Sequence, residues 1–328
     1  MDRPIHFASY LRPMVWGGRR LGELLGKPLP GNESYGESWE ISDHASHSSR
    51  VDRGPLAGQT LGDLMRRWRD PLLGAAASSH ASFPLLVKLL DANDWLSVQV
   101  HPDDEKVRTL WPGEGGKTEV WFVLDAAPDS KIYAGLKAGI DEARLRQALA
   151  QGTVANCLHS FTPQPGDCLF LRAGTVHAVG GGVLMAEVQQ TSDATFRLFD
   201  WNRRDAQGRS RPLHIEQALA CIDWEAGPVH PVRTPAFDEA PSGLLRNHPL
   251  AGCEYFQLDY LRAGDPFPCG GTGKLHILMV IQGAGRMVTG HGEEELRIGQ
   301  TWLLPASLPP VWCQPRPGLG LLFSTLPS

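Results

Sequence analysis

The sequence contains no long apolar run and no block of like charges. None of its 328 residues belongs to a stretch near the roughly 18 apolar residues that a membrane-spanning helix needs. The first residues, Met1 to Pro4, are not followed by the apolar core of a signal peptide. Basic stretches such as residues 66–69 are short, and the net charge is −5. We therefore expect a protein that binds neither membranes nor nucleic acid.

Cysteine is also scarce. The six cysteines lie far apart along the chain and form no C-x-x-C pair. Disulfide frameworks are typical of short secreted domains, whereas a chain of this length can bury a stable core without them. We therefore predict reduced thiols and a cytoplasmic location. The sequence does not indicate an oligomeric state.

Glycine and proline, in contrast, are abundant. The chain has 36 glycines and 26 prolines, well above the usual combined share of about 12%. Such an excess, spread along the whole chain, indicates many turns and many short strands. The apolar fraction of 42% and the charged fraction of 20% are those of a packed globular protein rather than a disordered one.

Local patterns predict a mainly β chain with a few helices. The first 55 residues read as turn-rich. Helices are expected at residues 60–69, 141–150 and 215–222. Strands are expected at residues 85–90, 96–100, 119–124, 168–171, 183–189, 195–199, 254–261, 274–281, 286–289, 295–298 and 300–304. Residues 225–242 are rich in proline and read as a linker, and similar patterns at 166–177 and 299–308 suggest two related β units.

Several of these strands carry metal-ligand residue types on one face. Gln99 and His101 are two residues apart and project to the same side of a strand. Glu119 lies on the next predicted strand, and His177 follows a tight turn after residues 168–171. Two histidines, a carboxylate and an amide oxygen form a plausible site for a borderline divalent metal. The alternative is that each is an ordinary polar residue, and the pattern alone leaves both open.

Charged residues on other strands suggest a polar cavity. Lys88 lies in the apolar segment LLVKLL, where a cation must be paired or face a cavity. Lys117 shares a strand face with Glu119, and Arg197 lies on a strand where it needs an anionic partner. That partner is either a ligand phosphate or, in a purely structural role, Asp193 or Asp200.

The sequence resembles type I mannose-6-phosphate isomerases, in particular the short bacterial form. The resemblance rests on QVHPDD at 99–104, KTEVW at 117–121, GTVHAV at 174–179 and EVQQTSDATFRLFDWNR at 187–203. Further matches are ESWEISD at 37–43, PLLVKLLD at 84–91 and IYAGL at 132–136. It extends from about residue 10 to residue 223, and the C-terminal third matches only loosely.

The resemblance implies a zinc-dependent aldose–ketose isomerase with a phosphosugar substrate. It implies one zinc ion per chain, held by His101, Glu119 and His177, with Gln99 as a further ligand. It also implies that Arg197 is an active-site residue and that Lys88 lies near the substrate. Lys117, Glu187 and Asp193 match polar positions of the family's pocket, and the proton-transferring base stays open among these three and water.

The family is built on cupin barrels, which are small antiparallel jelly rolls. We therefore expect a mainly β fold of two cupin barrels with a small helical insertion in the N-terminal part. Residues 1–235 would form the catalytic domain, and residues 236–328 a cupin-like domain without metal ligands. The second cupin motif fits residues 166–177, although Arg172 replaces the usual proline. Residues 299–305 keep the shape of that motif but lack its histidine.

Three other functions remain open. An isomerase of another phosphorylated sugar would keep the same metal set and differ in the shape of its pocket. An iron-dependent cupin oxygenase would use similar ligands. A non-catalytic sugar-binding bicupin would need a broken pocket, although every motif position that we compared is filled.

Overall fold

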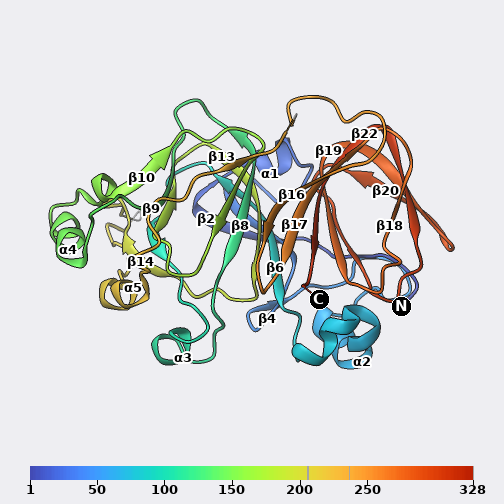
Figure 1. Ribbon diagram of the computed structural model, residues 1–328, viewed down its shortest axis with the longest axis horizontal. Coiled ribbons are helices and arrows are strands. Elements are labelled where there is room, and N and C mark those ends of the chain that lie inside the picture. The colour runs from blue at the N-terminus through green and yellow to red at the C-terminus, as the bar shows by residue number, and fades with distance from the viewer. Residues whose placement is uncertain (205–206, 236, 328) are drawn as a thin grey trace.

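The computed structural model describes residues 1–204, 207–235 and 237–327 as a mainly antiparallel β fold (Figure 1). The predicted β class is therefore confirmed. The α-helices are short: α1 Arg20–Glu23, α2 Leu61–Leu73, α3 Val107–Leu110, α4 Glu142–Ala150 and α5 Ile215–Cys221. Two 3₁₀ turns span Ala75–Ser79 and Val154–Cys157.

A seven-stranded sheet forms the centre of the molecule. In spatial order its strands are β15 Val232–Arg233, β11 Asp167–Leu171, β8 Glu119–Ala126, β13 Val183–Gln190, β6 Leu85–Ala92, β3 Tyr35–Ile41 and β2 Tyr10–Gly18. β6 is buried along its whole length. Because side chains alternate between the two faces of a strand, Val87 and Leu89 enter an apolar core while Lys88 faces the other way.

A five-stranded sheet lies toward the α4 and α5 end of the molecule (Figure 1). Its strands, in order, are β10 Leu158–Phe161, β9 Ile132–Leu136, β12 His177–Val179, β7 Val98–Val100 and β14 Phe196–Phe199. The register places His177 opposite Gln99, and Gln99 opposite Arg197. Three candidate site residues therefore lie side by side on adjacent strands.

An eight-stranded sheet contains most of the C-terminal strands. Its main path is β1 Ile5–His6, β21 Thr301–Leu304, β19 His276–Thr289, β22 Val311–Thr325, β17 Gln257–Ala263 and β16 Arg246–Gly252. β18 Phe267–Cys269 pairs with β22, and β20 Gly292–Arg297 pairs with β19. A separate two-stranded ribbon joins β4 Asp43–His44 to β5 His47–Ser48.

One apolar core joins the central sheet to the C-terminal strands. It includes Val87, Leu89 and Val120 from the seven-stranded sheet, packed with C-terminal residues such as Tyr260 and Ile277. A separate cluster fills the inside of the eight-stranded sheet around residues such as Leu278, Met287 and Leu319. The C-terminal strands thus have a core of their own and also cover the back of the sheet that carries Glu119.

Helix α2 shows how local chemistry sets the bounds of an element. Thr60 accepts a hydrogen bond from the Asp63 amide, and the Asp63 carboxylate accepts one from the Thr60 amide, which forms a capping box. The helix extends past the predicted end at residue 69, but Trp68 leaves helical backbone angles three residues before Pro71. Pro71 has no amide hydrogen to donate, so a kink is expected there.

Other predicted boundaries shift where tertiary pairing decides them. The two strands expected at 274–281 and 286–289 are one long strand, β19, because β22 pairs along most of its length. The turn-rich first 55 residues contain two strands of the central sheet, β2 and β3. In the part of the chain that the structure describes, no helix is long and apolar enough to cross a membrane.

Candidate metal centre

Three buried side chains from the two neighbouring sheets converge on one point. Glu119 begins β8 of the seven-stranded sheet, whereas His177 begins β12 and His101 follows β7 in the five-stranded sheet. One potential ligand atom from each lies within 4.8 Å of the others. All three residues are at most 2% exposed. The residues predicted to bind a metal are therefore brought together.

Each histidine is oriented by a hydrogen bond at its other ring nitrogen. Nδ1 of His101 lies 2.8 Å from the carbonyl oxygen of Ala194, and Nδ1 of His177 lies 2.9 Å from that of Thr175. A carbonyl only accepts, so both rings carry their proton on Nδ1 and leave an Nε2 lone pair free. Such a partner fixes the tautomer and orientation of a metal-ligating histidine.

The distances at the centre fit a tetrahedral metal ion. Nε2 of His101 lies 3.5 Å from Oε2 of Glu119, and Nε2 of His177 lies 3.4 Å from Oε1. Ligand atoms about 2.1 Å from one tetrahedral ion are themselves roughly 3.4 Å apart. His101 Nε2 and Glu119 Oε1 are buried without a hydrogen-bond partner. A bound cation would satisfy both atoms.

The ionisation states at the centre also suit a cation. Burial, reinforced by the charge of Lys117, lowers the pKa of His101 to about 4. Burial likewise lowers the pKa of His177. Burial alone would raise the pKa of Glu119, but Lys117 and His101 outweigh it, so the net pKa lies well below its ordinary value. At neutral pH the centre therefore offers two neutral imidazoles and one carboxylate.

Gln99 and Lys117 lie next to this cluster. The amide nitrogen of Gln99 is placed 3.2 Å from Nε2 of His177. Since the two ends of an amide are interchangeable by a rotation, its oxygen can face the same point. Nζ of Lys117 lies 3.0 Å from Oε2 of Glu119. The fourth predicted ligand is thus adjacent to the centre, and a cation borders it.

A row of paired residues crosses the neighbouring part of the central sheet. The register aligns Trp39, Lys88, Glu187 and Trp121 on four adjacent strands. Lys88 forms a buried ion pair of 2.9 Å with Glu187, whose other oxygen accepts a 2.9 Å hydrogen bond from the Trp121 indole. Burial lowers the pKa of Lys88, but Glu187 and Glu37 raise it more, so its net pKa is raised and the ammonium stays charged.

Lys88, Glu187 and Trp121 of this row line a cavity of about 240 Å³. Gln99 and Lys117, which border the metal centre, line it as well. The cavity is lined by the predicted residues Gln99, Lys88, Lys117, Glu187, Asp193 and Arg197. Asp193 is its most accessible carboxylate, with 38% of the side chain exposed. Burial raises the pKa of Asp193, but Lys88, Lys117 and Arg12 together lower it below its ordinary value. The carboxylate therefore stays ionised at neutral pH.

Arg197 is held by neutral groups rather than by a carboxylate. Its guanidinium donates to the hydroxyl of Ser97 at 3.3 Å and to the carbonyl of Pro212 at 2.9 Å. Asp200 pairs instead with Arg203 and Arg211. Among the described residues, Arg197 forms no ion pair with Asp193 or Asp200. The structure therefore contradicts the alternative of a purely structural Arg–Asp pair.

Sequence reasoning missed several residues that line the same cavity. They are Arg12, Glu37, Ser97, Trp111, Arg211 and His214. Arg12, on the edge strand β2, pairs at 2.9 Å with Glu37 on the neighbouring strand β3. Ser97 precedes Gln99 by two residues, so the strand alternation that indicated Gln99 also indicates Ser97. No local signal indicates the others, because the folding of distant segments brings them to the cavity.

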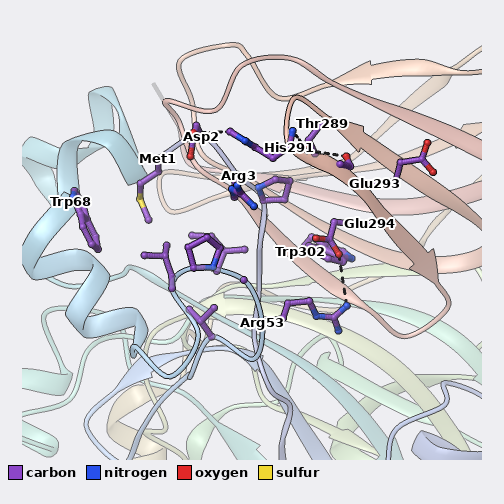
Figure 2. A pocket seen from close by; sticks show the side chains of 17 residues that line it. Met1, Asp2, Arg3, Arg53, Trp68, Thr289, His291, Glu293, Glu294 and Trp302 are labelled. Atoms are coloured by element: carbon purple, nitrogen blue, oxygen red, sulfur yellow. Dashed lines mark hydrogen bonds and ion pairs between the residues drawn. The ribbon is translucent and has the colours of Figure 1, made fainter.

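A second cavity, of about 310 Å³, lies between the N-terminal residues, the loop after Val51 and the β19–β20 hairpin (Figure 2). Several of its charged side chains interact with one another. His291 lies 2.7 Å from Asp2, and Arg53 lies over the ring of Trp302 with Glu294 at 3.9 Å. Lys88, Lys117 and Gln99, the last two beside the His–Glu centre, line the smaller cavity. Cavity size is thus a poor guide to the site here.

These features define a class of protein: a mainly antiparallel β protein with a His–Glu–His metal-binding triad beside a cation-rich cavity. The sequence profile of the phosphomannose isomerase type I catalytic domain matches residues 5–128. A mannose-6-phosphate isomerase of Streptococcus mutans is 36% identical over 308 residues, which cover 94% of both chains. One from Bacillus subtilis is 34% identical over 305 residues, covering 93% of this chain and 94% of the relative.

A solved structure agrees with these relatives. The crystal structure of the mannose 6-phosphate isomerase from Bacillus subtilis superposes with a TM-score of 0.86 and 29% identity, covering 98% of this chain and 99% of that one. The likeness spans the whole fold, including the C-terminal strands that the motifs did not reach. The chain therefore belongs to the type I mannose-6-phosphate isomerase family.

Proposed function

We propose that this protein is a zinc-dependent isomerase that interconverts mannose 6-phosphate and fructose 6-phosphate. One observation carries the proposal: the buried His–Glu–His centre lies against Gln99 and Lys117, which line one cavity together with Lys88 and Arg197. The family membership supports the same substrate, because the matched relatives are named for mannose 6-phosphate. The cofactor is one zinc ion, and the partner is the phosphosugar.

The reaction moves a proton between two adjacent carbons of the sugar and transfers the carbonyl from one to the other. Its difficult species is an enediolate, in which negative charge develops on oxygen. A site for this reaction needs positive charge beside those oxygens and a group that carries the proton. It also needs to hold a substrate that carries a dianionic phosphate.

The donor set suits zinc, since two imidazoles and a carboxylate leave further positions for an amide oxygen or water. We assign His101, Glu119 and His177 as ligands, with Gln99 as the fourth. When bound, zinc supplies Lewis acidity that stabilises charge on substrate oxygens, worth several kcal/mol of barrier. Lys117 then remains beside Glu119 and contributes a second positive charge at the same point.

Asp193 is the best placed of the candidate bases. Its carboxylate is ionised, accessible and held only loosely, with Arg12 at 3.6 Å. Glu187, in contrast, is committed to Lys88 and Trp121 on its two oxygens. We therefore assign proton transfer to Asp193, with Lys117 as the alternative, and assign Glu187 the task of holding Lys88 in its charged form beneath the substrate.

Arg197 supplies a cation at the other end of the cavity. Burial and the nearby charge of Arg211 lower its pKa, but it stays far above neutral. Because its guanidinium donates to Ser97 and Pro212, and no described carboxylate forms an ion pair with it, its charge is not cancelled within the part of the chain that the structure describes. We assign Arg197 to the anionic substrate, where it stabilises either the phosphate or the enediolate.

We also propose the family's two-barrel architecture for this chain. In this proposal the seven- and five-stranded sheets form the cupin barrel of a catalytic domain at residues 1–235, with α2 in a helical insertion. Residues 236–328 form a second, cupin-like domain without metal ligands. A cytoplasmic location is supported by the six cysteines, all free and five of them buried.

A coupled assay on mannose 6-phosphate tests the function. Turnover should be lost with a chelator and restored by zinc. Folded, zinc-loaded protein that is inert on mannose 6-phosphate would overturn the proposed substrate. Activity that survives complete removal of metal, verified by elemental analysis, would overturn the zinc mechanism.

A further inference from the structure

Tyr255 connects the C-terminal strands to the candidate active site. It lies in the turn between β16 and β17, where its ring packs against the shared core. Its hydroxyl donates a 2.7 Å hydrogen bond to Oδ2 of Asp104, at the end of the QVHPDD motif. The two residues are 151 positions apart in sequence. This contact belongs neither to the metal centre nor to the row of residues around Lys88 and Glu187.

Asp104 in turn holds the segment that carries Lys117. Its second oxygen, Oδ1, accepts hydrogen bonds from the Gly116 amide at 3.0 Å and from the Gln190 side chain at 3.2 Å. Gln190 then accepts from the Thr118 amide at 2.9 Å. The amides on both sides of Lys117 are therefore fixed by side chains that meet at one carboxylate.

The fit at this point is close. A Cβ atom at Gly116 would lie 2.5 Å from Oδ1 of Asp104 and 2.6 Å from the Asp104 amide nitrogen, so only glycine allows this approach. The Lys117 amide also donates to the carbonyl of Pro102 at 2.9 Å. The main chain that aims Lys117 at Glu119 thus depends on the position of Asp104.

We propose that Tyr255 is a positioning residue that acts through Asp104 to hold Lys117 and Glu119 in their productive places. A neutral hydroxyl that donates to one carboxylate oxygen fixes the plane of that carboxylate. The other oxygen is then aligned with the amide of Gly116. The C-terminal strands thereby contribute to the chemistry without a residue of their own in the cavity.

The first test does not depend on activity. Hydrogen exchange of the Gly116 and Thr118 amides should be about tenfold faster in Tyr255→Phe than in the unaltered protein, because their acceptors lose their anchor. Tyr260→Phe is the matched control. It also removes one tyrosine hydroxyl from the C-terminal strands, where that hydroxyl donates to Gln282 at 2.6 Å. It should leave exchange at both amides unchanged.

The second test rests on the proposed function. With zinc bound at full stoichiometry, Tyr255→Phe should lower kcat about tenfold with little change in KM, which is typical of a lost supporting contact. Tyr260→Phe should retain the unaltered kcat. In a double-mutant cycle, Asp104→Asn and Tyr255→Phe should together cost no more than Asp104→Asn alone, because both act on one path.

The outcomes separate the two proposals. Exchange rates and kcat in Tyr255→Phe that match those of Tyr260→Phe would overturn the positioning role. Fully additive losses in the cycle would overturn the path through Asp104. Faster exchange at Gly116 and Thr118 in a zinc-loaded protein inert on mannose 6-phosphate would support the positioning role and overturn only the proposed function.

Discussion

At the scale of single residues, the two candidate histidine ligands share one arrangement. Each ring donates Nδ1–H to a main-chain carbonyl and presents Nε2 to Glu119. The main chain thus selects the tautomer that can bind a cation before any cation arrives. Because both rings are also buried and neutral at pH 7, no proton has to leave them on binding.

His101→Ala and His177→Ala should each remove bound metal and activity together, since each change deletes one of the two buried imidazole ligands. Metal content by elemental analysis and turnover by the coupled assay would show this. His291→Ala, which alters a histidine of the second cavity, is the control and should retain both. Wild-type turnover in a metal-free variant would contradict a metal-dependent mechanism.

Arg197→Ala should lower turnover by at least about 100-fold while zinc stays bound, because its guanidinium bonds to Ser97 and Pro212 rather than to His101, Glu119 or His177, and it stabilises charge on the substrate. Turnover, metal stoichiometry and thermal unfolding should be measured together. Arg146→Ala, an exposed change on α4, should leave all three unaltered. Loss of folding in Arg197→Ala would instead show that its role is structural.

The candidate site was predictable from sequence as far as strand alternation reaches. Period-two spacing around His101 and Glu119 indicated which side chains share a face. The structure brings His101 and Glu119 together, and their same-face neighbours Gln99 and Lys117 line the cavity. The partners of Lys88 could not be read from its neighbours. They depend on the register of four strands, which is set by packing across the whole sheet.

At the scale of elements, helix α2 has a complete N-terminal capping box and a kink near its C-terminal end. The capping box satisfies amides of its first turn, whereas the non-helical backbone at Trp68 interrupts its last turns. Sequence rules located the start to within one residue because the cap is local. They missed the end at Leu73, because the chain resumes a helical turn after the kink.

Thr60→Ala should destabilise the protein by about 1 kcal/mol, since it removes the side-chain acceptor of the cap. Thr60→Ser keeps the hydroxyl and should be close to neutral. Urea unfolding of the three proteins at neutral pH would measure the difference. Equal stability of Thr60→Ala and the unaltered protein would show that the cap contributes nothing.

The cap should also weaken in acid. Hydrogen bonds from the Thr60 amide and hydroxyl lower the pKa of Asp63 to about 2, against 3.8 ordinarily. A carboxyl whose folded pKa is lowered stabilises the fold above its unfolded pKa, and this is lost as pH falls through the folded value. The stability advantage over Asp63→Asn should therefore be constant above about pH 5 and shrink toward pH 2. A constant difference across this range would contradict the argument.

Elements with a strong local signature were predicted best. The helices at 141–150 and 215–222 and the central-sheet strands β6, β8, β11 and β13 were located to within a few residues, because apolar spacing and caps are local properties. The central-sheet strands β2, β3 and β15 and the full length of β19 were not predicted. The extended backbone of β2 and β19 is stabilised by the strands beside them, and their own glycines and turn residues suggest the opposite.

At the scale of the whole molecule, the C-terminal strands cover the back of the central sheet. Phe256 and Tyr260 are fully buried in the same apolar cluster as Val120 and Phe122. The face of the sheet that carries the candidate site is thus supported from behind by strands that come later in the sequence, with Phe256 lying 134 positions after Phe122. Sequence patterns indicated a second β unit but gave no sign of this shared core.

Truncation after residue 240 should therefore give insoluble protein rather than an active fragment, because it exposes the apolar face that Phe256, Tyr260 and Ile277 cover. Solubility and the apparent mass in size-exclusion chromatography would test this. A soluble, monomeric fragment with full zinc content would contradict it and would show that residues 1–240 fold alone.

The place of β22 has a consequence for how the protein is made. This strand, Val311–Thr325, lies inside the eight-stranded sheet, paired with β19 on one side and β17 on the other. The ribosome synthesises it after β17 and β19, so these two strands keep open edges until β22 emerges. Open edges are templates for pairing with other chains. The growing chain is thus prone to aggregate while β17 and β19 are exposed and β22 has not yet emerged, and chaperone capture of chains stalled before residues 311–325 emerge should peak there.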